Sequence, residues 1–196
     1  SEHWKWKGRI VASGDRVVDS SGEAHDWSDC SGIPSSMEQI RSCIGYSLLT
    51  GHEPTTADCV GAYTQVMLPD SEVIYTIIPT HLWSKAMEEQ VRLLSGSGPM
   101  LAEGQVWWRL RRPLYGLSIA GDLWMKYLDQ KVRSLGFLPV EGAAQTWYRV
   151  ATNTLLTSYV DDLVLAGDGQ DKAWRELAKV VNITPPEPLR RVLGVD

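Results

Sequence analysis

The stretch of sequence that decides the fold is Tyr159-Val160-Asp161-Asp162. Short, apolar, β-prone segments flank it, at residues 154–159 before the carboxylates and at residues 163–166 after them. This pattern predicts a β-hairpin with the two aspartates at its tip. Aspartate is common in turns, so the stretch fits a plain hairpin turn. It also fits a metal site, because two adjacent carboxylates held between apolar strands repel each other unless a cation offsets their charge.

A third carboxylate stands much earlier in the chain. Asp58 ends a short predicted strand, and an aromatic residue, Tyr63, follows five positions later. The two stretches resemble the two metal-binding motifs of reverse transcriptases, most closely those of copia-type (pseudovirus) long-terminal-repeat retrotransposons. Four more segments match landmarks of that family in its order, at residues 7–11, 112–117, 135–137 and 193–195.

The resemblance implies an α+β fold with a polymerase-like palm and a small fingers subdomain. The palm would be a split βαβ arrangement, an antiparallel sheet with helices on one face, which sets Asp58 beside Asp161 and Asp162. The chain would form one domain, with fingers elements at about residues 1–54 and 79–115 and palm elements at about 55–78 and 116–196. The family's thumb and ribonuclease H domain would be absent, and a start without Met suggests a fragment of a longer product.

The resemblance also implies roles for individual residues. Asp58 and Asp161 would hold two Mg²⁺ ions, or Mn²⁺ in their place, assisted by Asp162 and by the main-chain carbonyl of Cys59. Tyr63 would act as the sugar gate that excludes a ribose 2′-hydroxyl, although a core aromatic is the alternative. The incoming nucleotide would meet Lys7, Arg9, Tyr115, Gly116 and Val160. The template and primer would meet Arg109, Arg111 and Arg112. For Lys7 and Arg9, an ordinary exposed strand face is an equal alternative.

Further elements follow from local patterns. The capping box Ser35-Ser36-Met37-Glu38 predicts a helix that ends at Gly51, with Met37, Ile40, Ile44 and Leu48 on its inner face. Hydrophobic periodicity predicts strands and helices in other parts of the chain. We expect a hairpin at 7–12 and 16–19, strands at 55–62, 72–78, 105–111, 145–150 and 189–195, a helical turn at 63–68, and helices at 81–94, 119–135 and 170–181.

Composition sets broader limits. The 196 residues are 22% charged and 43% hydrophobic, as in a soluble globular domain, and most of the nine Trp should lie in the core or a groove. The chain contains no signal peptide or membrane-length apolar run, and its three Cys lack metal-ligand spacing, so we expect an intracellular protein with reduced thiols. The net charge of −5 counts against a free-standing nucleic-acid binder. A basic stripe is nevertheless available at Arg109, Arg111, Arg112, Lys126, Lys131 and Arg133, although a solvated helix or strand surface is the alternative for most of these residues taken singly.

The function implied by the resemblance is RNA-directed DNA polymerisation. Its partners would be an RNA or DNA template with primer, deoxynucleoside triphosphates, and integrase and ribonuclease H domains of a polyprotein, but no membrane. The chain departs from the family where Ser118-Ile119-Ala120-Gly121 replaces Lys-Gln-Ala-Pro. An inactive descendant that serves as a binding or structural domain is therefore the alternative. Another palm-fold phosphotransferase, such as a nucleotidyl cyclase, is a third possibility that leaves Tyr63 and Tyr115-Gly116 unexplained.

Overall fold

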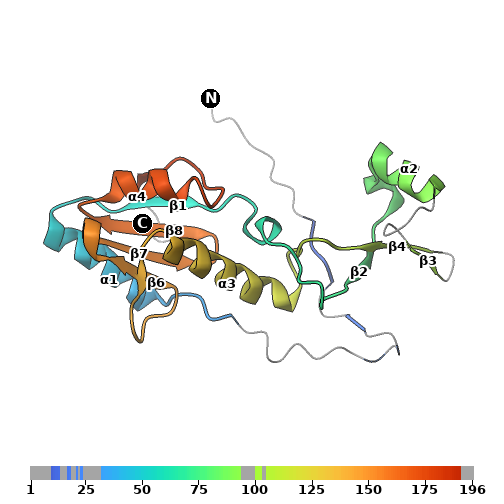
Figure 1. Ribbon diagram of the computed structural model, residues 1–196, viewed down its shortest axis with the longest axis horizontal. Helices are drawn as coiled ribbons and strands as arrows, with labels where there is room; N and C mark the ends of the chain where they lie inside the picture. The colour runs from blue at the N-terminus through green and yellow to red at the C-terminus, as the bar shows by residue number, and fades with distance from the viewer. Residues whose placement is uncertain are drawn as a thin grey trace.

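The fold is α+β, with helices packed on an antiparallel sheet (Figure 1). The structure is a computed structural model that describes residues 10–13, 17, 18, 21, 23, 32–93, 100–102 and 105–190. The main sheet has six strands in the order β5-β6-β7-β8-β1-β9. Their bounds are β1 Thr55–Asp58, β5 Leu138–Pro139, β6 Thr146–Arg149, β7 Thr154–Tyr159, β8 Asp162–Gly167 and β9 Glu187–Pro188.

A second sheet has three strands in the order β2-β4-β3 and lies with helix α2 at the far end of the molecule (Figure 1). Its strands are β2 Tyr75–Ile77, β3 Met100–Ala102 and β4 Gln105–Arg109. The α-helices are α1 Met37–Thr50, α2 Lys85–Leu93, α3 Ser118–Ser134 and α4 Gln170–Leu177. Within the described residues, the short 3₁₀ helices η2, η3 and η4 span Ala62–Gln65, Thr80–Leu82 and Val150–Thr152.

The predicted hairpin is β7–β8, and it forms the centre of the main sheet. Tyr159 pairs with Asp162, so the two-residue turn consists of Val160 and Asp161. The prediction that both aspartates form the tip is therefore half wrong, because Asp162 is already the first residue of β8. Every residue from 163 to 167 is buried, as expected of a central strand covered on both faces.

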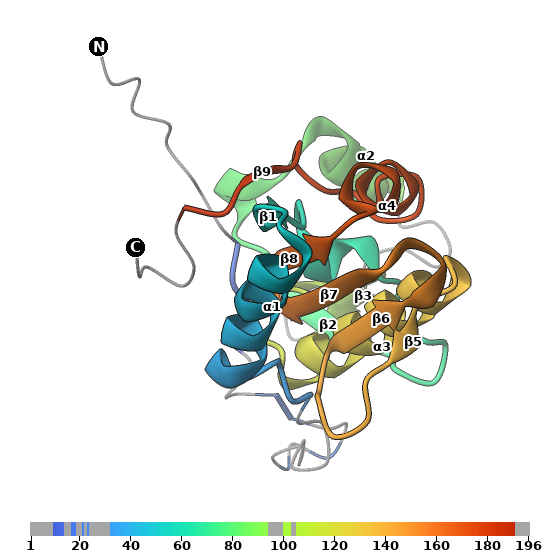
Figure 2. The same cartoon turned by 90° about the vertical axis from the view of Figure 1, so that its left-hand side faces the viewer.

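Successive side chains of β8 point to opposite faces of the sheet, and their neighbours show which helix covers each face. Leu163 and Leu165 pack in the core that contains α3 and α4, whereas Val164 and Ala166 pack against Cys43 of α1. Helices thus cover both faces of the sheet, and the prediction of helices on one face is wrong (Figure 2). The physical reason is the uninterrupted apolar run of β8, which cannot leave either side to water.

Helix α1 begins and ends close to the predicted positions. The capping box is made by Ser36 and Gln39, one residue later than predicted from Ser35 and Glu38, and Gly51 ends the helix in the left-handed conformation at φ 71°. The predicted inner face is wrong at Leu48, which is 80% exposed. The residues of α1 that are buried are Ile40, Cys43 and Ser47.

Other predicted elements are found with different bounds. The helix predicted at 81–94 is divided into η3 and α2, the helical turn at 63–68 is the 3₁₀ helix η2, and α4 ends at Leu177. The short strands β3 and β5 were not predicted, because two or three residues carry no periodicity. The predicted strand 189–195 is replaced, within the described residues, by β9. Most of the predicted hairpin 7–19 lies outside the described residues.

The division into fingers and palm elements does not follow the sheets at two places. Helix α1, grouped with the fingers, packs on the six-stranded sheet, and β2, grouped with the palm, pairs with β4 in the three-stranded sheet. The prediction that most Trp side chains lie in the core is confirmed for Trp108, Trp124, Trp147 and Trp174, which are buried.

Among the described residues, no helix is both long and apolar enough to cross a membrane.

Candidate functional site

Three carboxylates meet where the end of β1 lies beside the β7–β8 turn. Asp58, the last residue of β1, lies directly opposite Asp162, the first residue of β8. The Cys59 backbone N–H donates to the Asp161 carbonyl at 2.7 Å, which ties the end of β1 to the turn. About a hundred residues separate the two motifs in the chain, and the pairing of β1 with β8 brings them together.

Because successive side chains of a strand point to opposite faces of the sheet, the buried neighbours of Asp58 and Asp162 show which face these two carboxylates occupy. Ala57 and Cys59 are buried in the core with α3 and α4, so Asp58 between them lies on the opposite face of the strand. Asp162 occupies the same face, because it precedes the core residue Leu163. Asp58 is exposed, and Asp161 and Asp162 are half-buried.

Burial and charge act together on this cluster. Burial raises the pKa of Asp162 above its ordinary value, and the neighbouring charges of Asp161 and Asp58 raise it further. Burial likewise raises the pKa of the Cys59 thiol, with smaller contributions from the same three carboxylates. A cation placed here would oppose the repulsion, and carboxylate oxygens are the donors that Mg²⁺ prefers.

The donor set therefore fits a hard divalent ion, although the side chains are not gathered around a single point. Within the part of the chain that the structure describes, no three His, Cys, Asp or Glu side chains form a group that could hold a metal ion. The backbone pairing brings the three carboxylates to neighbouring positions without setting their final orientation.

The Val160-Asp161 turn has an unusual backbone. Val160 has φ +56°, whereas Asp161 is not among the residues with positive φ. A positive φ at the first central residue alone is the pattern of a type II′ turn, which normally has glycine at this position. For a β-branched residue this conformation is strained, so surrounding contacts must hold it.

Tyr63 lies next to the carboxylates. It belongs to η2, the element that comes after β1 in the chain, and its ring packs at a tilt of 44° against that of Tyr115, with centroids 4.7 Å apart. Burial raises the pKa of Tyr63, and the charge of Asp161 contributes to the shift. The predicted gate residue, the predicted nucleotide contact Tyr115 and Asp161 are thus neighbours.

Gly116 is required by the chain's own backbone. Its φ is +93°, and an added Cβ would lie 2.1 Å from the Ala12 carbonyl oxygen. The Ala12 backbone N–H donates to the Tyr115 carbonyl at 2.7 Å, and Val11 forms a parallel bridge with Tyr115. The close backbone approach that this glycine allows is made by residues 11 and 12 of the chain itself.

The predicted basic residues are only partly available for a nucleic acid. Arg109 lies on β4, and Arg111 and Arg112 are exposed in the bend that follows it. Arg112 donates to the Thr64 carbonyl at 2.6 Å, so it supports the segment that carries Tyr63. On α3 the basic residues have partners on the helix itself, Lys126 with Asp122, Arg133 with Asp129, and Lys131 over the ring of Tyr127.

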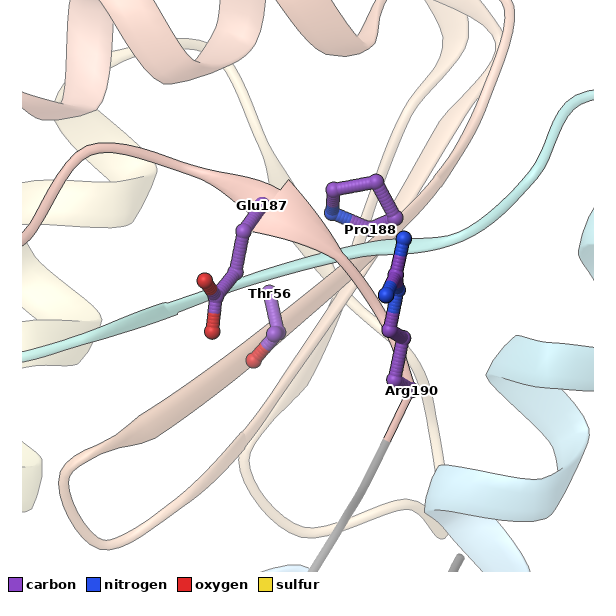
Figure 3. Close-up of a pocket in the computed structure, with 4 residues that line it drawn as sticks. All are labelled: Thr56, Glu187, Pro188 and Arg190. Carbon is purple, nitrogen blue, oxygen red and sulfur yellow. The ribbon is translucent and has the colours of Figure 1, made fainter. Parts of the chain in front are cut away.

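Two groups of predicted residues lie elsewhere. Lys7, Arg9 and the landmark at 193–195 fall outside the described residues. A pocket of about 290 Å³ lies beside β1 and β9, lined by Thr56, Glu187, Pro188 and Arg190 (Figure 3). Thr56 precedes Asp58 by two positions and so shares its face of β1, but the pocket is not lined by any of the predicted site residues.

Sequence analysis missed the residues that hold the turn. Trp124 of α3 is fully buried, and its indole Nε1–H donates to the Val160 carbonyl at 2.7 Å. The Ser158 hydroxyl donates to the same carbonyl at 3.2 Å. The helical spacing of Trp124 with Leu128 and Val132 is typical of a buried face, and a buried indole requires an acceptor. No local signal identified that acceptor.

No family model matches this chain, and no curated protein matches it. The functional assignment therefore depends on the motifs and on the geometry described above.

Proposed function

We propose that this chain is the palm-and-fingers part of an RNA-directed DNA polymerase of the copia retrotransposon type. The observation that carries the proposal is the pairing of β1 with β8, which sets Asp58 opposite Asp162 and ties Cys59 to Asp161. A plain hairpin turn explains one carboxylate at its tip. It does not explain a third carboxylate on the neighbouring strand, on the same face, in a cluster whose mutual repulsion opposes folding.

In the proposed reaction the chain binds the metal ions and thereby orients the reacting groups and neutralises the charge of the phosphates. When bound, Mg²⁺ would lower the pKa of the primer 3′-hydroxyl and stabilise the leaving pyrophosphate. Asp58 and Asp161 would hold the ions, with Asp162 and the Cys59 carbonyl assisting. The pairing of β1 with β8 brings Asp58 and Asp162 to directly opposite positions beside Asp161. No general base is needed, since phosphoryl transfer depends mainly on position and charge.

The Tyr63–Tyr115 pair supports the choice of deoxynucleotides as substrates. Tyr63 follows the first metal motif by five residues and lies within electrostatic range of Asp161. Its ring is braced by Tyr115, so it cannot easily swing away from an incoming sugar. A fixed ring at this place would clash with a 2′-hydroxyl and exclude ribonucleotides by steric contact.

The test is primer extension on an RNA template with Mg²⁺. The wild-type chain should add deoxynucleotides, and Asp161→Asn should abolish addition. Asp168→Asn is the matched control, because Asp168 is also an acidic residue next to β8 but lies at its other end, bonded to Asn153. Equal extension by both variants would refute the assignment of Asp161.

The sugar gate is tested in the same assay. Tyr63→Ala should allow ribonucleotides in with little loss for deoxynucleotides, whereas Tyr63→Phe keeps the ring and should keep the discrimination. Unchanged discrimination in Tyr63→Ala would show that the ring serves only in packing.

A second candidate function is an inactive descendant that binds or scaffolds. Two observations favour it: the family's Lys-Gln is replaced at residues 118 and 119, and, in the described part of the chain, Lys126 and Arg133 of α3 pair with acidic residues of their own helix. Phosphate contacts supply most nucleic-acid affinity, so such a chain would hold primer–template weakly. Metal-dependent extension by the wild type would reject this candidate.

A further inference from the structure

The carbonyl groups of Val160 and Asp161 each accept a hydrogen bond from a part of the chain remote from the turn, and the Val160 carbonyl accepts a second from within the hairpin. On the N-terminal side, the Val160 carbonyl accepts from Trp124 Nε1 at 2.7 Å and from Ser158 Oγ at 3.2 Å. On the C-terminal side, the Asp161 carbonyl accepts from the Cys59 backbone N–H at 2.7 Å. Three donors from α3, β7 and the end of β1 therefore surround one residue.

The bond from Trp124 acts on the peptide group that determines the turn type. The Val160 carbonyl belongs to the central peptide of the turn, and turns of type II′ and type I′ differ by rotation of that peptide. In the rotated form Asp161 would itself have positive φ, and its side chain would point in a different direction. Holding the carbonyl against Trp124 selects one orientation, even though Val160 must keep a strained φ of +56°.

Because Trp124 is buried, the hydrogen bond from its indole to the Val160 carbonyl has a fixed geometry. Its side chain has no exposed surface and packs in the main core with Leu128 and Leu163. A buried indole N–H without an acceptor is unfavourable, so the core itself favours the turn conformation that offers the Val160 carbonyl. Ser158, 1% exposed, adds a second donor from within the hairpin.

We infer that Trp124 is a positioning residue that, together with Ser158, orients Asp161 for metal binding by fixing the Val160–Asp161 peptide. The inference rests on the proposed function, because it assigns to Trp124 an effect on a metal that Asp161 would bind. Groups that orient metal ligands from behind typically change metal affinity or activity by about 10–100-fold when they are removed.

The experiment compares two Trp→Phe variants. Trp124→Phe removes the indole N–H and keeps an aromatic ring in the core. Trp147→Phe is the matched control: Trp147 is equally buried, and its Nε1 donates at 2.8 Å to Asp129 on α3, outside the site. Both variants lose one buried hydrogen bond and should lose similar thermal stability. Binding of Mn²⁺ alone is then measured by electron paramagnetic resonance of the free ion.

We expect Trp124→Phe to bind Mn²⁺ about tenfold or more weakly than the wild type, and Trp147→Phe to bind it with unchanged affinity. Ser158→Ala, a smaller change, should weaken binding in the same direction. If Trp124→Phe does not fold, Ser158→Ala carries the test in its place. Equal Mn²⁺ affinity in the wild type and the folded variants of Trp124 and Ser158 would overturn the inference.

Failure of the proposed function gives a different result. In that case the wild-type chain would bind Mn²⁺ no better than Asp161→Asn, and the inference would fall with the function. If the wild type binds better than Asp161→Asn while Trp124→Phe matches Trp147→Phe, only the positioning role is refuted. In primer extension, a positioning role predicts a lower kcat with little change in the nucleotide KM, which a general loss of stability would not produce.

Discussion

Replacing Gly116 by alanine should break the contact between this position and residues 11 and 12. Two separate effects contribute. At φ +93° a residue with a Cβ is strained by about 1–2 kcal/mol. The new Cβ would also lie 2.1 Å from the Ala12 carbonyl oxygen and 2.9 Å from Val11 Cγ1, so residues 11 and 12 must move. Their movement breaks the bond from the Ala12 N–H to the Tyr115 carbonyl, about 0.5–1.5 kcal/mol.

The two effects together lower the free energy of unfolding by about 1.5–3.5 kcal/mol. Gly142→Ala separates them, because Gly142 has φ +74° and an added Cβ there would meet no atom within 4 Å. It should show the strain alone, about 1–2 kcal/mol. The difference between the two variants is then the contribution of the contact with residues 11 and 12.

Urea unfolding at equilibrium measures both variants, and amide hydrogen exchange at Ala12 reports the contact directly. In Gly116→Ala the Ala12 amide should exchange much faster than in the wild type, and in Gly142→Ala it should exchange at the wild-type rate. If Gly116→Ala is no less stable than Gly142→Ala, and the Ala12 amide stays protected, residues 11 and 12 do not pack on Gly116 and the reasoning fails.

Three further changes test the site and the core. Burial raises the folded-state pKa of Asp162, so the charge of this carboxylate opposes folding at neutral pH. Asp162→Asn should therefore raise the free energy of unfolding at pH 7. Below pH 3.8 the wild-type carboxyl is protonated, and an equal gain in the free energy of unfolding there would contradict this reasoning. Val160→Gly should change the free energy of unfolding by less than about 1 kcal/mol, because relief of the strain at positive φ offsets the greater chain entropy of glycine in the unfolded state. A larger loss of stability would show that Val160 is not strained. Arg149→Met should lower stability by about 2–3 kcal/mol, because the buried Arg149 bonds Glu176 and lies over the ring of Phe137. Because Arg149 lowers the pKa of Glu176, this loss should shrink as acid protonates Glu176, and a pH-independent loss in urea unfolding would show that the ion pair contributes little.

Several features of this protein follow from local sequence alone. Strand β7 has the predicted bounds, α3 differs from its prediction by one residue at each end, and α1 ends at the predicted glycine. These features depend on alternation, helical spacing and end signals, all of which act between residues close in the chain. The two carboxylate motifs, through their resemblance to a family of known topology, also predicted that Asp58 lies beside Asp161 and Asp162.

Tertiary structure alone decided the rest, because it depends on partners far away in sequence. Periodicity could place Leu48 on one stripe of α1, but the position of the sheet left it 80% exposed and buried Cys43 instead. Composition could not show that both faces of β8 are covered by helices. No local signal linked Trp124 to the Val160 carbonyl, a contact across 36 positions of the chain. Local interactions set what each segment can become, and packing between segments determines which side chain meets which carbonyl.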